Sequence, residues 1–496
     1  MNQNISISSP MRPQTMTGST LLTCAVFILL GVIVPLVLFL NSDGDFSVNV
    51  LLMLCIVVWC QLRLAFTGIR GQRRFTLICF YAFIYVFLGV QPSLSVSMHA
   101  FPQDVYLSEG LEAFAGFLIV LGILAFELGY ILGRGKVNAA HLYKKQYKIL
   151  SLKILWGGNA VVGLMALLVM AYYGPGTFIA LRGYTGDTIF WSRGVDYTEL
   201  VFVVYAVRGL AAVLLFFTVY LWKIRTHLAL TPSRLSSLKF ALWFIAPLNL
   251  LVSNPIAAPR QWAGSLMLTL LFLSMRWKGI RSFLVLTMLT CLSLLTLFSG
   301  TDPRHFGAAL SQGEGVNAST VGSLIKDGVQ GLATDCNFDA FSMLAATTQY
   351  TENYGYSLGR QLLLPMFFWV PRTIWESKPE GTHKVVADSL GLDHWNVSSP
   401  LWSEGYMNFG VFGLFLFLFL FGWVARACDD FQVRTTDSPG PALQTVCSSF
   451  FASNAFILLR GDLCAGTLYL QLVVMMAFLV VYLDGRLFKG QLTSAI

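Results

Sequence analysis

Charged and aromatic side chains gather in one stretch of the chain, residues 362–413, while most of the remaining sequence is apolar. Carboxylates and imidazoles are candidate bases for taking a proton from a sugar hydroxyl. The candidates in this stretch are Glu376, Glu380, His383, Asp393, His394 and Glu404. A solvated surface charge is the alternative for each, but Glu404 differs because it lies beside an apolar run that begins near Tyr406. The tryptophans between these charges, Trp375 among them, fit either sugar-stacking platforms or an interfacial aromatic belt.

Arginines also occur where the topology of a membrane protein does not require them. They lie within apolar runs, or on the side of the membrane opposite the basic connections described below: Arg182, Arg193, Arg208, Arg260, Arg304, Arg372 and Arg460. Arg208 lies near the middle of an apolar run, which costs at least about 2.5 kcal/mol unless the charge is paired or faces water. A guanidinium binds phosphate oxygens in two places, and fixed cations stabilise a diphosphate leaving group as its charge develops. We therefore predict a lipid-linked diphosphate ligand; structural ion pairs, such as Arg460 with Asp462, are the alternative.

The segment SNPIAAPRQWAGS, residues 253–265, places one of these arginines at a helix terminus. Its two prolines are expected to break the helix and to let the next helix begin at Arg260. The exposed N–H groups and the dipole at a helix start favour anions. An ordinary tight turn between two helices is the alternative.

The composition defines the class of protein that must position these residues. The 496 residues are 56% hydrophobic and only 12% charged, with a mean hydropathy of +0.67, whereas soluble chains carry about 25% charged residues. A polytopic membrane protein within a lipid bilayer is therefore predicted. The net charge of +8 does not indicate nucleic-acid binding, because the basic residues are sorted by side of the membrane. Scattered cysteines without a CxxC pair predict neither a disulfide framework nor a zinc site.

About twelve apolar stretches are long enough for a transmembrane helix, which needs about 20 residues. They are residues 19–40, 47–66, 75–94, 111–133, 150–173, 198–222, 238–256, 260–276, 282–300, 405–425, 441–459 and 464–485. Alternate connections are rich in lysine and arginine, which predicts that both termini are cytoplasmic and that residues 301–404 form one large periplasmic loop. Nine helices then lie in residues 1–300 and three in residues 405–496.

Within the predicted loop, two segments carry an apolar pattern. Phe338, Phe341, Leu344, Ala345 and Thr348 recur at helical spacing, which predicts an amphipathic helix on the membrane face. The run 362–370 is too short to span a bilayer, so we expect it to lie in the interface or to pack on other helices.

Four motifs in residues 250–415 resemble those of bacterial oligosaccharide repeat-unit polymerases, the O-antigen polymerase or Wzy-type family. The clearest is VPRTIWESKP at 370–379, which is similar to a P-R-x-x-W-x-x-K-P signature. SEGYMNFGVFG at 403–413 is similar to the segment before a late helix of that family. The others are Asn254-Pro255 with Arg260 and Gly264, and Asn337-Phe338-Asp339 leading to residues 354–357.

The resemblance implies an all-α fold like that of the GT-C-like integral-membrane glycosyltransferases. It implies an enzyme of the bacterial inner membrane that moves a glycan from undecaprenyl diphosphate onto another lipid-linked repeat. It implies no metal or other cofactor, and a polysaccharide chain-length regulator as a candidate partner. By position in the motifs, Arg260, Arg372, Lys378, Glu404 and Tyr406 are carried over as site residues.

We expect Arg372, assisted by Lys378, to stabilise the leaving diphosphate, and Glu404 to orient or deprotonate the acceptor hydroxyl. Arg208, Arg304, Trp375 and His383 are further candidates for binding diphosphate or glycan, Arg304 by location alone. A purely structural ion pair between Arg372 and Glu404 is the alternative.

Three other functions share parts of this pattern. A lipid-linked-oligosaccharide flippase or other transporter shares the helix count, although it does not need a large outer loop. An O-antigen ligase would pass the glycan to the lipid A core. A metal-dependent transferase that uses monophosphate-linked sugars would place a metal on Asp43 and Asp45.

The predicted topology can be tested by cysteine labelling. A cysteine introduced near Gly315 should react with a membrane-impermeant reagent from the periplasm, because the alternation of lysine and arginine places this loop outside. Protection of that cysteine, together with labelling from the cytoplasm, would overturn the topology.

Overall fold

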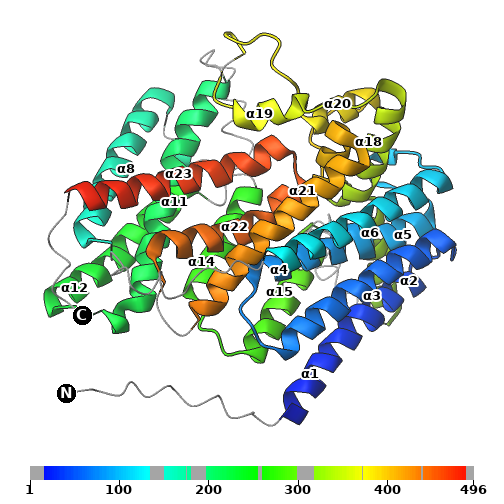
Figure 1. Cartoon of the computed structure of the whole chain (residues 1–496), viewed down its shortest axis with the longest axis horizontal. Coiled ribbons are helices and arrows are strands. Elements are labelled where there is room, and N and C mark those ends of the chain that lie inside the picture. The colour runs from blue at the N-terminus through cyan, green and yellow to red at the C-terminus, as the bar shows by residue number, and fades with distance from the viewer. Residues whose placement is uncertain are drawn as a thin grey trace.

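The computed structural model of the chain is built from helices, and its described residues form no strand (Figure 1). The structure describes residues 16–133, 150–174, 176–179, 197–228, 230–254, 260–298, 318–370, 372–436 and 440–487. The N-terminal elements are α1 (Met16–Ile28), η1 (Leu29–Ile33), α2 (Val34–Leu40), α3 (Val48–Ile69), α4 (Phe75–Phe83), η2 (Ile84–Val90), α5 (Gln91–Met98), η3 (Pro102–Asp104) and α6 (Glu109–Leu132). The middle elements are α8 (Leu152–Tyr173), α9 (Gly176–Ile179), α11 (Tyr197–Ile224), η4 (Arg225–His227), α12 (Pro232–Phe240), η5 (Ala241–Ile245), α13 (Ala246–Ser253), α14 (Arg260–Ser274) and α15 (Ile280–Phe298).

Short elements then precede the C-terminal helices. They are α17 (Ala318–Thr334), η6 (Cys336–Phe338), α18 (Ala340–Tyr354), η7 (Arg360–Leu362), α19 (Leu363–Met366) and α20 (Thr382–Ser389). The chain closes with α21 (Leu401–Arg434), α22 (Ala442–Arg460) and α23 (Leu463–Leu487). Figure 1 shows α18, α19 and α20 at one end of the bundle, here called the loop end, and α12 at the other. The end with α12 also carries the connections rich in lysine and arginine, so we call it the basic end.

Ten helical segments of the described part are long and apolar enough to cross a membrane, which confirms a multi-pass helical protein. Three of them are continuous rods in which a π-helical turn joins two α-helices: Thr20–Leu40, Phe75–Met98 and Pro232–Ser253. The remaining two predicted segments are α14 and α15, whose apolar described portions are shorter. The total of twelve spans stays a prediction.

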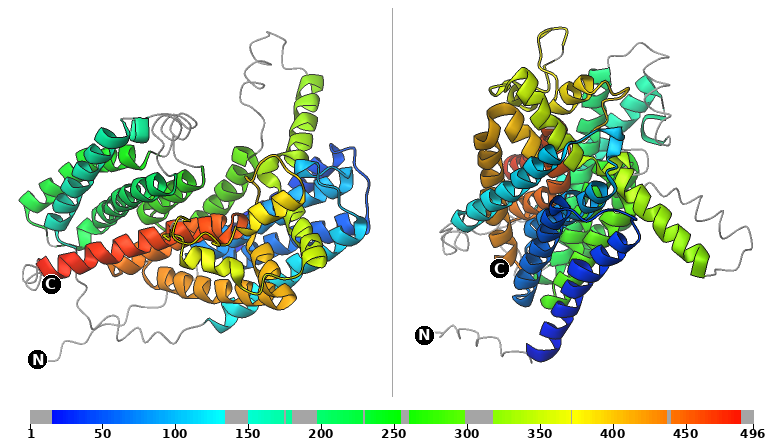
Figure 2. Two further views of the ribbon diagram at one scale, coloured as in Figure 1. Left: turned by 90° about the horizontal axis from the view of Figure 1, so that it is seen from above. Right: turned by 90° about the vertical axis from the view of Figure 1, so that its right-hand side faces the viewer.

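Two apolar cores hold the helices together. One includes buried side chains of α3 to α6, α15, α18 and α21, and the other includes those of α8, α11, α14 and α23. Helix α22 supplies residues to both, with Ala455 in the first core and Phe450 in the second. Figure 2 shows the blue and cyan helices of the first core apart from the teal and green helices of the second, with α23 in red. Helices α22 and α23 thus join the two halves.

The predicted amphipathic helix is present as α18, but its predicted place was wrong. Every residue from Ala340 to Thr348 is buried, so this part of the helix has no exposed polar face. It packs against α6 and α21, and Phe338 lies in η6, before the helix begins. The helical spacing of apolar residues predicted this helix, but it could not show that the polar faces of the helix would be buried as well.

Helix α21 begins earlier than predicted and contains a break. Phe409 (φ −143°, ψ 24°) and Gly410 (φ 63°, ψ −148°) leave the helical conformation, which separates residues 401–408 from the long remainder. The positive φ of Gly410 favours glycine. The N–H groups of Ser357 and Leu358 donate to the carbonyls of Met407 and Asn408 at 2.9 and 3.0 Å. The break is therefore capped by the loop that follows α18.

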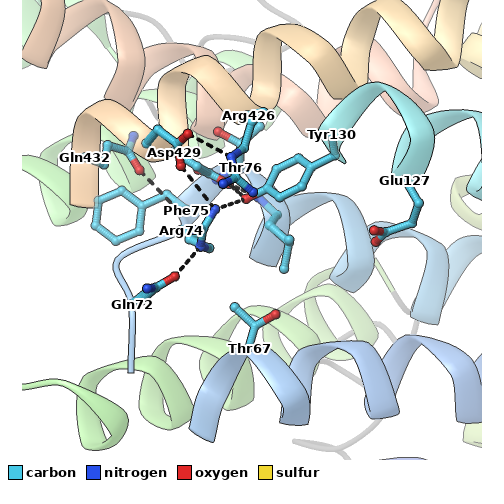
Figure 3. A network of polar contacts seen from close by, with 12 residues as sticks. Thr67, Gln72, Arg74, Phe75, Thr76, Glu127, Tyr130, Arg426, Asp429 and Gln432 are labelled. Carbon is cyan, nitrogen blue, oxygen red and sulfur yellow. Dashed lines mark hydrogen bonds and ion pairs between the residues drawn. The ribbon is translucent and has the colours of Figure 1, made fainter. Parts of the chain in front are cut away.

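At the basic end, a polar network fixes the start of α4 against α21 (Figure 3). Asp429 accepts hydrogen bonds from the N–H groups of Thr76 and Leu77 at 2.9 and 3.1 Å, and from the hydroxyl of Tyr130 at 2.8 Å. Arg74 donates to the same hydroxyl at 2.7 Å. Arg74, Tyr130 and Asp429 thus bind one another or the first N–H groups of α4, so we assign this network to structure.

Helices α6 and α21 lie so close that glycine is required at their contact. A Cβ atom at Gly129 would collide with the backbone of Phe419, and one at Gly422 would collide with the backbone of Phe126. These backbones touch directly, as they do where small residues line transmembrane interfaces.

We predict that Gly129→Ala separates α6 from α21 and lowers the thermal unfolding midpoint of the protein in detergent, since overpacking costs about 1–3 kcal/mol. The matched control is Gly163→Ala in α8, where a Cβ meets no atom within 4 Å. The control should be neutral or slightly stabilising, because alanine is favoured over glycine inside a helix by about 0.5–1 kcal/mol. Equal effects of the two substitutions would contradict this contact.

Candidate active site

Glu404 is buried in the first turn of α21, just before the break in that helix. Its side chain accepts hydrogen bonds from the hydroxyls of Ser399 and Thr382 at 2.7 and 2.9 Å, and from the N–H of Leu463 at 3.3 Å. These donors come from the segment before α21, from α20 and from the start of α23. No lysine or arginine of the described part pairs with this carboxylate. The donors that hold this carboxylate in place are two hydroxyls and one backbone N–H.

His383, in the first turn of α20, lies beside the same carboxylate. Its Nδ1 atom is 3.7 Å from Oδ1 of Asp462, which is beyond hydrogen-bond distance, and it has no hydrogen-bond partner among the described residues. Burial alone lowers the pKa of His383, but Asp462, Glu404 and Glu380 together raise that pKa above its usual value. The imidazole therefore tends to be protonated within a group of carboxylates.

A second buried carboxylate, Asp339, holds the segment that leads into α21. It accepts from the N–H of Ser398 at 2.9 Å and also from the Ser398 hydroxyl. Arg460 pairs with Asp339 at 3.4 Å and donates to the carbonyl of Asn337 at 3.0 Å. The suggested pairing of Arg460 with Asp462 was wrong, because Asp462 lies against His383 instead. Burial raises the pKa of Asp339, and Arg460 and Ser398 oppose that rise.

Arg372 and Lys378 both bind backbone carbonyls of the turn that contains them. Arg372 donates to the carbonyls of Lys378 and Pro379 at 2.9 and 3.3 Å and pairs with Glu380 at 2.9 Å. The Lys378 ammonium donates to the carbonyls of Phe368 and Val370 at 2.9 and 2.8 Å, and burial lowers its pKa. The structure does not bring Arg372 within ion-pair distance of Glu404. The alternative of a structural pair between those two residues was therefore wrong. The contacts of Arg372 and Lys378 stay within residues 368–380.

Arg208 is buried in the middle of α11, and no carboxylate of the described part pairs with it. One of its terminal nitrogens donates to the carbonyl of Thr177 at 3.2 Å, while Nε has no partner among the described residues. The guanidinium lies over the rings of Phe178 and Tyr205, 5.9 and 5.8 Å from their centres. The Tyr469 hydroxyl on α23 donates to that of Tyr205 at 3.3 Å. Arg208 thus carries a buried charge whose described contacts are rings and one carbonyl.

Polar side chains that the sequence analysis missed lie on α13, which packs against α11. Asn249 is fully buried, and neither polar atom of its amide has a hydrogen-bond partner in the described part. The Ser253 hydroxyl, one turn later, is also buried without a described partner. The sequence could have indicated these two residues, because they are polar residues within the apolar run 238–256. Ser399, Thr382 and Asp462 were missed because nothing in their spacing indicates a common neighbour.

Of the other predicted site residues, the side chains of Tyr406 and Trp375 are described, whereas those of Arg260 and Arg304 are not. Helix α14 begins at Arg260, after α13 ends at Ser253, as the prolines predicted; the Arg260 side chain lies outside the described residues, and so does all of Arg304. Tyr406 is buried one half-turn after Glu404, with its ring 5.8 Å from that of Tyr356. Trp375 is in the turn of Arg372 and donates to the Ser377 hydroxyl at 3.1 Å.

Helix α23 connects the surroundings of Glu404 with those of Arg208. At its start, the Leu463 N–H reaches Glu404 and Asp462 lies beside His383. Tyr469 follows six residues after Leu463 and contacts Tyr205, a displacement of about 9 Å along the helix axis. Gln471 then donates to the carbonyl of Pro365 in α19 at 3.2 Å. One helix therefore contacts the surroundings of the carboxylate, the histidine and Arg208 in turn.

A metal centre finds no support in the described part of the chain, which holds no group of three or more metal-ligating side chains. Asp43 forms an ion pair with Lys326 of α17, and both side chains are largely exposed. The Asp43-Gly44-Asp45 motif is therefore engaged in joining α17 to the turn after α2.

The sequence matches no protein-family model, no curated protein and no solved structure. The structure itself defines a multi-pass helical membrane protein with buried polar and charged side chains.

The raised pKa of His383 predicts a specific pH dependence of stability. An imidazolium favoured in the folded state stabilises it fully below the unfolded pKa of about 6.5, and this contribution is lost as the pH rises through the folded pKa. Asp462→Asn should therefore flatten the decline of the thermal midpoint between about pH 6 and pH 8, while asparagine keeps the helix cap on Ala465.

His383→Gln should flatten the same curve, and His394→Gln, at an exposed position, should not. Parallel curves for the unmodified protein, Asp462→Asn and His383→Gln would contradict the assignment.

Proposed function

We propose that this chain is a glycosyltransferase that joins undecaprenyl-diphosphate-linked oligosaccharide repeat units at the periplasmic face of a bacterial inner membrane. The observation that carries the proposal is that a buried carboxylate, Glu404, and a buried guanidinium, Arg208, lie near one helix, and that neither forms an ion pair with a lysine, arginine, aspartate or glutamate of the described part. Unpaired charge in an apolar environment is costly. A diphosphate would pair with Arg208, and a hydroxyl of the same substrate class would donate a hydrogen bond to Glu404. The motifs at 370–379 and 403–413 support the same function.

Glu404 is suited to receive a hydroxyl proton. An ionised carboxylate has about four positions that accept hydrogen bonds, and three are taken by Ser399, Thr382 and Leu463. One position remains for the acceptor sugar. In the proposed step the acceptor oxygen bonds to the anomeric carbon of the donor and its proton passes to Glu404. The bond from that carbon to the diphosphate breaks, and the electron pair leaves with the diphosphate.

The departing diphosphate needs cations in a water-poor setting. Arg208 has an unused Nε–H among the described contacts, and Arg260 at the start of α14 is its proposed partner. Arg304 remains a candidate. We assign Arg372 and Lys378 to positioning the loop, because their donors are used on backbone carbonyls and Glu380. His383, Trp375 and Tyr406 are proposed to contact the glycan.

Several coarser features belong to the same proposal. They are twelve spans, cytoplasmic termini, a periplasmic loop end, a GT-C-like arrangement and a chain-length regulator as a partner. The flippase and the ligase remain the competing functions. The metal-dependent transferase is disfavoured by the ion pair of Asp43 with Lys326, and EDTA in a purified reaction would test it.

We predict that Glu404→Gln and Arg208→Lys each reduce polymer formation by about a hundred- to a thousandfold, as the loss of one aligned contact in a transition state does. Glutamine cannot take the proton, and a lysine point charge cannot reproduce the guanidinium fork. The measurement is a lipopolysaccharide or capsule gel from a deletion strain that carries each variant at equal membrane abundance. A core capped by a single repeat is the expected product.

Asp393→Asn and Arg486→Gln change exposed charges and should leave the ladder unchanged. A bare core in the deletion strain would favour the ligase or flippase, and a normal ladder would exclude all three functions. Near-normal polymer from Glu404→Gln at normal abundance would remove Glu404 from the mechanism.

A further inference from the structure

A cavity of about 260 Å³ lies at the basic end of the second core, far from the candidate active site. It is enclosed by the start of α8, the end of α11, the connection that follows and α12. Six leucines line it: Leu150, Leu152, Leu221, Leu228, Leu230 and Leu238. Its charged lining residues, Lys153 and Arg234, are both basic and both exposed. The cavity therefore combines an apolar interior with a cationic rim.

The surrounding helix faces the lipid rather than other parts of the chain. Phe240, Trp243 and Phe244 are 48%, 74% and 61% exposed on the rod formed by α12, η5 and α13. Trp156 of α8 donates to the hydroxyl of Ser237 at 3.0 Å and stacks near Phe240, at 5.4 Å between ring centres. This contact holds α8 and α12 together beside the cavity. An exposed apolar helix face therefore borders the cavity.

The hydrogen bonds already made near the cavity limit what can bind there. Ser151 donates from its hydroxyl to Asp484 of α23 at 2.6 Å and from its N–H at 3.2 Å, so it is engaged. Arg234 pairs with no carboxylate of the described part. An anion is therefore expected at the rim beside Arg234, away from Asp484.

We propose that this cavity binds an anionic glycerophospholipid, with its phosphate between Lys153 and Arg234 and the first part of an acyl chain among the leucines. Basic pockets between helices on the positively charged side of membrane proteins recognise anionic headgroups in this way. The volume lies just below the usual range for small-ligand pockets, from about 300 Å³ upward, which fits one end of a lipid and not the whole molecule. This site does not depend on the proposed glycosyltransferase activity.

The test uses the purified full chain in detergent, titrated with phosphatidylglycerol, phosphatidylcholine or inorganic phosphate, with bound lipid counted by native mass spectrometry. Phosphatidylglycerol should bind most tightly. A basic residue near a membrane surface contributes about a fivefold effect, so Lys153→Gln with Arg234→Gln should weaken that binding by roughly thirtyfold. Both substitutions are at exposed positions, so the fold should persist.

The matched control removes the same charge from the same end of the bundle. Lys239→Gln with Lys278→Gln, both exposed and outside the cavity lining, should change phosphatidylglycerol binding by less than about twofold. Leu230→Trp, which fills the cavity without changing charge, should also weaken it. Equal binding of phosphatidylcholine, equal binding of inorganic phosphate alone, or equal losses in the two double variants would each overturn the proposal.

Discussion

The loop end depends on one constraint, which is that backbone polar groups removed from water must find partners within the protein. The break at Phe409 and Gly410 frees carbonyls of α21, and the N–H groups of Ser357 and Leu358 take them up. The loop after α18 and the break in α21 are therefore stable only together. The short helix 401–408 that results is buried on all sides. Because the break ends this helix before residues 411–434 begin, Glu404 lies on a separate, buried helical segment.

Two neighbouring serines link this short helix to the rest of the bundle. Ser398 binds Asp339 at the start of α18, whereas Ser399 binds Glu404 and donates from its N–H to the carbonyl of Arg460 at 3.1 Å. One dipeptide therefore serves two buried carboxylates. Asp339 also has Arg460 as a counter-ion, while Glu404 has only neutral donors. The difference in their partners is what separates a structural carboxylate from a candidate catalytic one.

Hydropathy was sufficient to predict the class of fold, because a transmembrane helix must be apolar along its whole length. It did not predict the start of α21, since Ser403 and Glu404 lower the hydropathy of the first turn, although residues 401–408 are all buried within the protein. The turn of Arg372 could be located from VPRTIWESKP, but its contacts could not, because they join side chains to carbonyls that carry no sequence signal. Arg208 was found because a charge in an apolar run is rare. Asn249 and Ser253 are uncharged and barely change the hydropathy of their helix, so they were missed, although they are buried at least as deeply as Arg208.

The arrangement of charge in the two halves follows from how each half is built. In the first core, the buried carboxylates Asp429 and Glu404 are both held by hydrogen-bond donors, Asp429 by Tyr130 and the start of α4 and Glu404 by Ser399, Thr382 and Leu463. The second core contains Arg208 and the amide of Asn249, which lack such partners among the described residues. A buried polar group left unpaired lowers stability, so its persistence is explained when a ligand supplies the missing partner. Helix α23 contacts Glu404 through Leu463 and Tyr205, beside Arg208, through Tyr469. The helix that joins the two halves therefore also fixes how Arg208 and Glu404 are placed relative to each other.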